Sequence, residues 1–357
     1  MEPDNLLHLI IDANASDLHI KADGRPCLRV DGVVRLTDLP AFDMHEVERF
    51  ALGLMDDRQR ELFSQKNEID FAFTSPGVGR FRVNAFRQRG SIGLAIRKVV
   101  SEQPGIAELN LPPIVEKLIQ EPRGLILVTG IAGSGKTTTL NAMIDHINKT
   151  QERHIITIED PIEVLHKDIK SFINQREIGI DTDSYADALK HVVRQDPDVI
   201  MIGEMRDMET AKAALSASEI GNLVMSSLHT VDATETINRI IDLFPPEQQK
   251  QVRLMLAATL KGIISLRLLP KIGGGRIPAV EVMVATATIR EYIINEDETS
   301  KINEAIEQGE YYGMHTFDQA LLALIDAGLI RSEDAMATSS HAHDFKIKAK
   351  QAGFFVA

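Results

Sequence analysis

The sequence is poor in cysteine, in long apolar runs and in positive charge, and each shortage excludes a class of protein. Its one cysteine, Cys27, excludes an intramolecular disulfide and a zinc site built from several cysteines, and it fits a reducing compartment. No apolar run approaches the ~18 residues that a membrane-spanning helix needs, and the acidic start lacks the basic region of a signal peptide. The formal net charge of −13 argues against a general nucleic-acid binder. We therefore expect a soluble cytoplasmic protein.

The chain does have the composition of a globular protein. Hydrophobic residues make up 44% and charged residues 25% of its 357 residues, which excludes a disordered or fibrous protein and leaves room for two or three domains. Residues 101–113 contain three prolines and a glycine, and they predict a linker because proline breaks both helices and sheet ladders. We expect one domain over 1–100 and a second over 114–357.

The first domain has the pattern of a small α/β domain. Apolar residues alternate with polar ones in the segments expected to be strands, and they recur at helical spacing in the others. The predicted helices cover 6–11 and 44–63, and the predicted strands cover 17–21, 28–34, 71–73, 79–87 and 92–100, with turns at Gly24, Pro26 and Gly32.

From residue 114 onward, short apolar runs alternate with helical patterns, which predicts a doubly wound parallel sheet. The runs expected to form buried strands are 124–129, 154–158, 199–202 and 223–227, and the intervening helices include 137–148, 185–193 and 208–218. An added hairpin is expected over 266–270 and 277–284. Several short helices are expected over about 287–357.

A phosphate-binding loop is the most specific motif. Residues 130–137, Gly-Ile-Ala-Gly-Ser-Gly-Lys-Thr, match G-x-x-x-x-G-K-[ST] between a buried strand and a helix. Glycines let backbone N–H groups close around phosphate oxygens, Lys136 would reach the β- and γ-phosphates, and the Thr137 hydroxyl would bind Mg²⁺. The alternative is a glycine-rich turn without a ligand. The predicted nucleotide-binding residues are Gly130, Ile131, Ala132, Gly133, Ser134, Gly135, Lys136, Thr137 and Thr138.

Hydrolysis also needs a carboxylate on the metal side and a group that orients water. Asp198 opens the strand over 199–202 and Glu204 follows it; we favour Glu204, since ligands collect at the carboxyl ends of strands. The predicted strand over 154–158 is followed by three acids, Glu159, Asp160 and Glu163, which would repel one another unless a cation lay nearby. A solvated loop is the alternative interpretation.

Histidines and arginines supply further candidates. His229 follows a third core strand, where a neutral imidazole could sense a γ-phosphate, although a lone histidine is usually structural. His341 and His343 lack a complete ligand set and are expected at the surface. Residues 80–98 carry six cations, among them Arg82 and Arg97, and no acid. They form either a solvated basic face or arginine fingers that reach a nucleotide across a domain or subunit boundary.

These segments together resemble the secretion ATPases of type IV pilus and type II secretion machines, in particular the PilT-like pilus retraction ATPases. The resemblance extends over nearly the whole chain. It rests on the Walker A segment over 130–140, the Asp box Ile158-Glu-Asp-Pro-Ile-Glu163, Asn174-Gln-Arg-Glu177, the Walker B region over 194–207, the His box Leu228-His-Thr230 and a C-terminal segment over 313–318.

The resemblance implies a homohexameric ring whose subunits join an N-terminal PAS-like domain to a RecA-like ATPase domain with C-terminal helices. ATP and Mg²⁺ would be bound, Glu163 would orient water and Glu204 would stand on the Mg²⁺ side. His229 would sense the nucleotide state, and the N-terminal domain would supply Arg82 and Arg97. ATP turnover would drive type IV pilus retraction and twitching motility, with the ring docked on the cytoplasmic face of an inner-membrane platform protein.

Three departures from the family pattern accompany this resemblance. Relatives commonly have Pro-Thr where this chain has Ile131-Ala132, the first histidine of the His box falls at Asn222, and the C-terminal retraction motif is only partly kept over 288–295. Two alternatives therefore stay open, an extension or secretion ATPase of the same superfamily and an accessory ring subunit with weak turnover. The extension enzymes typically carry an extra N-terminal domain and a four-cysteine zinc module, which we do not expect in 357 residues with a single cysteine.

Overall fold

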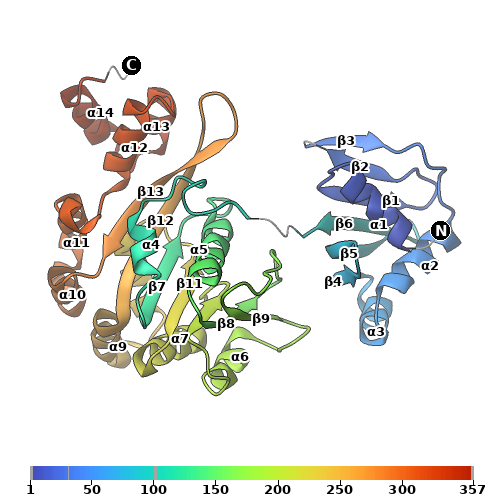
Figure 1. The fold of residues 1–357 in the computed structure, drawn as a ribbon, viewed down its shortest axis with the longest axis horizontal. Coiled ribbons are helices and arrows are strands. Elements are labelled where there is room, and N and C mark those ends of the chain that lie inside the picture. The colour runs from blue at the N-terminus through green and yellow to red at the C-terminus, as the bar shows by residue number, and fades with distance from the viewer. Residues whose placement is uncertain (1–2, 31, 100–102, 355–357) are drawn as a thin grey trace. The chain divides into compact units, whose positions relative to one another are not determined.

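A computed structural model describes residues 3–30, 32–99 and 103–354 of the chain (Figure 1). The chain divides into two compact units. The first unit holds the described residues up to 99 together with 163–165, and the second holds 103–162 and 166–354.

The first unit is built on a six-stranded antiparallel sheet with the order β3-β2-β1-β6-β5-β4. Its elements are α1 (Pro3–Asp12), β1 (Asp17–Lys21), β2 (Cys27–Val30), β3 (Val33–Leu36), α2 (Met44–Leu54), α3 (Asp57–Lys66), β4 (Glu68–Ser75), β5 (Gly79–Gln88) and β6 (Ser91–Lys98). Apolar residues of all three helices and of the sheet share one core, which includes Leu7, Val47, Phe63 and Phe81.

Two predicted elements of this unit are each divided in the structure. The single helix expected over 44–63 is α2 followed by α3, because the Asp56 side chain accepts from the Gln59 N–H and starts a new helix with a capping box. The strand expected over 28–34 is the hairpin β2–β3, which turns at Gly32 with a φ of +79°. Glycine adopts that backbone conformation at little cost.

The predicted linker over 101–113 is described from residue 103 onward. It contains turns but no helix or strand. Ile106 and Leu111 nevertheless lie buried in the core of the second unit, so this stretch packs as part of that unit. Residues 101 and 102, like Val100 at the end of the strand expected over 92–100, lie outside the described residues.

The second unit contains the predicted doubly wound sheet, with seven strands in the order β13-β12-β7-β11-β10-β8-β9. All neighbouring strands are parallel except β12 and β13. The strands are β7 (Gly124–Thr129), β8 (His154–Glu159), β9 (Phe172–Glu177), β10 (Val199–Ile202), β11 (Leu223–Leu228), β12 (Leu260–Pro270) and β13 (Arg276–Val284). The four predicted buried strands are confirmed. The hairpin is also present, but its first strand begins at Leu260 rather than at residue 266, because its early residues pair with β7. Strand β9 was not predicted.

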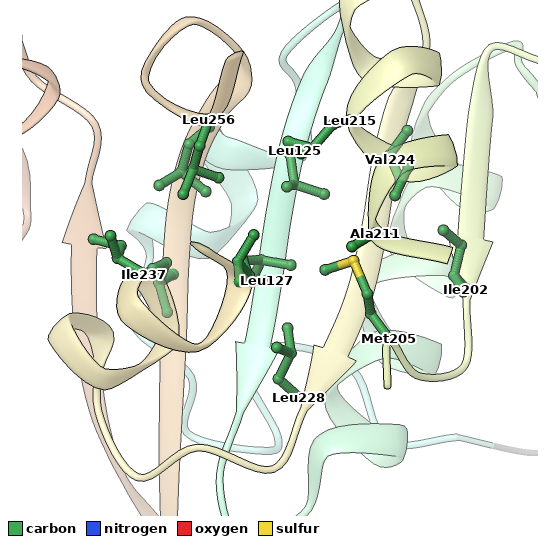
Figure 2. Packing of buried hydrophobic residues seen from close by; sticks show 14 of the residues in the cluster. Leu125, Leu127, Ile202, Met205, Ala211, Leu215, Val224, Leu228, Ile237 and Leu256 are labelled. Carbon is green, nitrogen blue, oxygen red and sulfur yellow. The ribbon is translucent and has the colours of Figure 1, made fainter. Parts of the chain in front are cut away.

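Helices cover both faces of this sheet because its central strands are apolar on both sides. Leu125 and Leu127 pack against one set of helices (Figure 2). The alternate residues Ile126 and Val128 pack against the other set. The helices on the side of Leu125 include α6 (Tyr185–Val192), α7 (Met208–Ile220), α8 (Ala233–Asp242) and α9 (Pro246–Thr259). The opposite side carries α4 (Ile114–Leu118) and α5 (Lys136–Thr150).

The C-terminal helices predicted over 287–357 are present. They are α10 (Ala287–Ile294), α11 (Ile302–Glu307), α12 (Phe317–Asp326), α13 (Ser332–Thr338) and α14 (Ala342–Gln351), with short 3₁₀ turns at Glu296–Lys301 and Glu310–Tyr312. Helices α12–α14 share a small core with the outer half of the β12–β13 hairpin. Figure 1 shows these helices at the C-terminal end of the second unit. Over the described ranges, none of the helices combines the length and apolarity needed to cross a bilayer.

Candidate functional site

The glycine-rich loop connects the end of β7 to the start of α5, as the motif predicts. Gly130, Gly133 and Gly135 have φ values of +144°, +77° and +100°, in the region that favours glycine. A Cβ at Gly130 would also lie 2.6 Å from the Leu266 carbonyl oxygen. The loop therefore needs glycine for both its backbone conformation and its close packing.

The Lys136 side chain is buried inside this loop. Its ammonium donates to the carbonyl oxygens of Gly130 at 2.8 Å and Ile131 at 3.0 Å. Burial lowers the pKa of Lys136, and the negative charge of Glu204 partly offsets that change. The Ser134 hydroxyl is also buried and has no hydrogen-bond partner within the described ranges. The loop thus presents a cation and an unpaired hydroxyl, the kind of groups that bind phosphate oxygens.

His229 and Glu204 lie beside Lys136. His229 Nδ1 is 3.4 Å from Lys136 Nζ, and His229 Nε2 is 3.5 Å from Glu204 Oε2. Because an ammonium group can only donate, Nδ1 is assigned as the acceptor and the proton of a neutral ring is assigned to Nε2, facing the carboxylate. The structure thus brings together these three predicted residues, which come from three different connections of the sheet.

Glu204 has a second cation within reach. Its Oε2 lies 2.7 Å from Arg206 Nε, and the Glu204 side chain is 16% exposed. The preceding Gly203 allows close packing, since a Cβ there would lie 2.8 Å from the Tyr185 hydroxyl. Burial, and then the charges of Glu204, Asp160 and Glu159, raise the pKa of Tyr185, which keeps this phenol protonated. Sequence reasoning placed Tyr185 in a helix but gave no sign of its place in the site.

Asp198, the alternative acid, lies at the amino ends of the strands, opposite the carboxyl ends where the phosphate-binding loop lies. Its Oδ2 accepts from the His154 N–H at 2.8 Å, and its Oδ1 is 3.7 Å from Arg153 Nη1. The Asn222 side chain lies at the same end of the strands, where it donates to the Pro197 carbonyl oxygen. Both residues therefore stand at the amino ends of the strands, away from the phosphate-binding loop.

The three neighbouring acids at the end of β8 and in the loop after it lie in different environments. Glu159 is buried, and its Oε1 accepts from Thr157 Oγ1 at 2.6 Å and from Gln175 Nε2 at 3.2 Å. Asp160 and Glu163 are exposed, and the Asp160–Pro161 peptide bond between them is cis. Hydrogen bonds to the buried acid and solvation of the other two reduce the repulsion expected from the sequence.

The predicted arginines belong to a row of charged residues that crosses the sheet of the first unit. Arg82 on β5 stands opposite Arg97 on β6, Arg97 opposite Asp17 on β1, and Asp17 opposite Arg29 on β2. Arg97 Nε lies 2.7 Å from Asp17 Oδ1, whereas Arg29 Nε is 3.9 Å from Asp17 Oδ2. Burial raises the pKa of Asp17, but hydrogen bonds from Ser16 and Arg97 outweigh it, and the net pKa is lowered. Arg97 therefore has a partner within its own unit.

One buried acid lies next to the helix that follows His229. Glu281 Oε1, on β13, accepts from the Ala233 N–H at 2.9 Å, at the start of α8. Burial raises the pKa of Glu281 to about 7, although hydrogen bonds from the backbone and the charge of Arg267 favour its ionised form. The sequence offered one signal for it, a single acid within an apolar strand.

The remaining histidine prediction concerned a metal site. His341 and His343 are both exposed at the start of α14. Across the residues that the structure describes, three or more histidine, cysteine or acidic side chains nowhere gather as metal ligands.

Comparison with known proteins connects this site to a family. The type II/IV secretion system protein family matches residues 3–327. The type IV pilus retraction ATPase PilT of Pseudomonas aeruginosa is 45% identical over 335 residues, 94% of this chain and 97% of that protein. A twitching motility protein of Neisseria gonorrhoeae is also 45% identical, over 87% of this chain and 83% of its own. A crystal structure of the pilus retraction motor PilT with bound ADP superposes with a TM-score of 0.88, covering 95% of this chain and 98% of that one.

Proposed function

The chain belongs to the type II/IV secretion system protein family, and from that premise we propose that it is the motor ATPase that powers type IV pilus retraction and twitching motility. The observation that carries the proposal is the juxtaposition of Lys136, His229 and Glu204 at the phosphate-binding loop. A glycine-rich turn without a ligand would not need a buried ammonium beside a histidine and an acid. The similarity to PilT over 94% of this chain specifies the kind of work that turnover performs.

Each residue of the loop has a distinct task in binding nucleotide. The backbone N–H groups of Gly133 and Gly135 surround phosphate oxygens, and the helix dipole of α5 adds a partial positive charge. Lys136 exchanges its bonds to loop carbonyls for bonds to the β- and γ-phosphates. The exposed Ile131 and Ala132 leave this function intact, because the phosphates are bound by backbone groups.

Turnover requires charge neutralisation and an oriented water molecule. Thr137, exposed in the first turn of α5, and Glu204 would hold Mg²⁺, which neutralises charge on the phosphates when bound. The buried unpaired hydroxyl of Ser134 and the ammonium of Lys136 fit a phosphate–metal group at this place. Glu163 orients the attacking water, and His229 registers the γ-phosphate through its position between Lys136 and Glu204.

The motor works as an assembly. We place it in a homohexameric ring at the cytoplasmic face of the inner membrane, docked on the platform protein of the pilus machine. Arg82, with Arg97, stabilises the transferring phosphoryl charge across a domain or subunit boundary. These assignments rest on the similarity to PilT over more than nine tenths of both chains.

Deletion of the gene tests the proposed work directly. Surface pili are counted by electron microscopy, and motility is measured on the same cells. Abundant pili with lost motility are expected, because filaments would assemble but not be withdrawn. Bald cells would show that the protein extends pili, and normal pili with normal motility would contradict a principal role in retraction.

A further inference from the structure

Strand β9 connects to the loop that carries Glu163 through two of its side chains. Gln175 and Glu177 lie on one face of the strand, since side chains two residues apart point the same way. Both hydrogen-bond to backbone N–H groups of the loop, Gln175 to His166 and Glu177 to Ile162. Glu163 thus follows one of these fixed residues directly and precedes the other by three positions.

Gln175 occupies a position that requires an amide. Its Oε1 accepts from the His166 N–H at 2.9 Å, while its Nε2 donates to the buried Glu159 Oε1 at 3.2 Å. A carboxylate here would accept the first bond, but it would place a second negative charge against Glu159. The residue therefore connects the buried acid at the end of β8 to the far end of the loop.

Glu177 fixes the near end of the loop. It is 3% exposed, and its Oε2 accepts from the Ile162 N–H at 3.1 Å. Because the close-packed interior leaves this side chain little freedom to move, the contact is well suited to hold a loop.

The far end of the loop is also connected to the phosphate-binding helix. The His166 imidazole Nε2 lies 2.8 Å from Oδ1 of the fully buried Asn141, whose Nδ2 donates to the Thr137 carbonyl oxygen at 2.9 Å. Since Asn141 uses its amide N–H toward Thr137, the ring nitrogen of His166 is assigned as the donor. A continuous series of contacts therefore runs from β9 through His166 to the residue expected to bind Mg²⁺.

We propose that Gln175 and Glu177 are positioning residues that hold both ends of the loop around Glu163 in register with the phosphate-binding loop. Their side chains contact the loop backbone and Glu159, so their effect on turnover would pass through Glu163. The inference deepens the proposed function and rests on it for its effect on turnover. Its structural part, the anchoring of residues 162 and 166, has a readout that needs no turnover.

The same strand provides matched controls on its other face. Asn174 Nδ2 lies 2.9 Å from His154 Nε2, and Arg176 Nη2 donates to the Asp181 carbonyl oxygen. Neither bond reaches the loop over 160–166. Asn174→Ala and Arg176→Ala therefore disturb β9 without releasing Ile162 or His166.

The experiment combines steady-state ATPase kinetics with hydrogen–deuterium exchange on the full-length protein. For Gln175→Glu and Glu177→Ala, we expect kcat to fall about tenfold or more while the KM for ATP stays within about twofold. Exchange at the 162 amide should accelerate about tenfold or more in Glu177→Ala, which removes its acceptor. Exchange at the 166 amide should accelerate similarly in Gln175→Glu, because repulsion from Glu159 moves the new carboxylate away from the loop. Glu177→Gln keeps an acceptor for the Ile162 N–H and should restore kcat to within about threefold of wild type. The two control variants should match wild type in both measurements.

The readouts separate this inference from the proposed function. Unchanged exchange at 162 and 166, or faster exchange with an unaltered kcat, would overturn the positioning role. An equal loss of kcat in Asn174→Ala would also overturn it, because the effect would then belong to the strand as a whole. If wild type lacked ATP turnover, the proposed ATPase would fail, and the exchange data alone would still decide whether the loop is anchored as described. If Gln175→Glu does not fold, Glu177→Ala and Glu177→Gln provide the same comparison.

Discussion

Asn222 and His229 stand at opposite ends of β11, one just before the strand and the other just after it. Six residues separate them, and the seven steps from one to the other correspond to about 23 Å along an extended strand. Asn222 donates to the Pro197 carbonyl oxygen, whereas His229 lies between Lys136 and Glu204. The residue that replaces the first histidine of the family pattern is therefore remote from the phosphate-binding loop of its own chain.

Because the two residues lie so far apart, we expect their substitution to have different effects on kcat. His229→Ala should lower kcat about tenfold or more, because Lys136 and Glu204 lose the group between them. Asn222→Ala should leave kcat within about twofold and lower the unfolding free energy by about 1 kcal/mol, since it removes one hydrogen bond. ATPase assays and urea denaturation measure both effects. A larger loss of kcat in Asn222→Ala would show that it acts on the site.

Lys136 can be tested against another lysine of the same helix. Lys136→Ala should abolish binding of a fluorescent ATP analogue and reduce turnover to background, because the loop loses its buried ammonium. Lys149, near the end of α5, is exposed and pairs with Asp145, so Lys149→Ala should bind the analogue like wild type. Substantial turnover in Lys136→Ala would refute the assignment of the phosphate-binding loop.

Arg82 and Arg97 are neighbours across two strands but should respond differently to substitution. Arg97→Ala removes the 2.7 Å ion pair with Asp17 and should lower the unfolding free energy by about 1 kcal/mol, a value kept small because Arg97 is 65% exposed. Both variants should lower kcat about tenfold, with native assembly on a sizing column, so the two differ in the loss of stability expected for Arg97→Ala. Unchanged kcat in both variants would leave these arginines as a solvated basic face.

Glu281 makes a specific contribution to the dependence of stability on pH. Its pKa is raised from 4.5 to about 7, so below pH 4.5 the carboxyl is protonated in both the folded and the unfolded state. As pH rises from 4.5 to about 7, this carboxyl ionises first in the unfolded state. The free energy of unfolding therefore falls by about 3 kcal/mol in total. Wild type should therefore lose stability relative to Glu281→Gln between pH 5 and pH 8.

Chemical denaturation of both proteins at the two pH values measures this difference. Glu291→Gln, which changes an exposed acid on α10, is the control and should track wild type. If Glu281→Gln and wild type changed in parallel with pH, the buried acid would not titrate in this range. Asp232 and Arg267, whose charges also act on Glu281, are unchanged in this comparison.

The parts of the fold that could be predicted are those in which local sequence and burial agree. β7 and β10 are continuous apolar runs because both faces of the central sheet are covered, and their predicted bounds match the structure. Edge strand β9 was missed because it consists largely of polar residues, Asn174 to Glu177, that gain their positions through side-chain bonds. The break between α2 and α3 depends on one capping aspartate within an otherwise helical pattern.

The site was predictable where a motif fixes backbone geometry and not where distant side chains meet. The glycine pattern located the loop of Lys136, and strand ends located Glu204 and His229. The pair formed by Asp17 and Arg97 joins residues 80 positions apart, and no local pattern reveals such a contact. Tyr185 likewise reaches Gly203 only through the packing of α6 on the sheet.

The β12–β13 hairpin belongs to the cores on both faces of the sheet and to a third, smaller core. Its inner half, with Leu266 and Val282, lies in the core of the sheet, and its outer half, with Leu269 and Ile277, lies in the small core of α12–α14. Such a divided arrangement makes the last three helices a candidate foldon, able to open at a lower free energy than the sheet while the hairpin stays paired. Substitutions in these three helices should then leave the folding of the nucleotide site unaffected. Heat should melt the protein in more than one cooperative step.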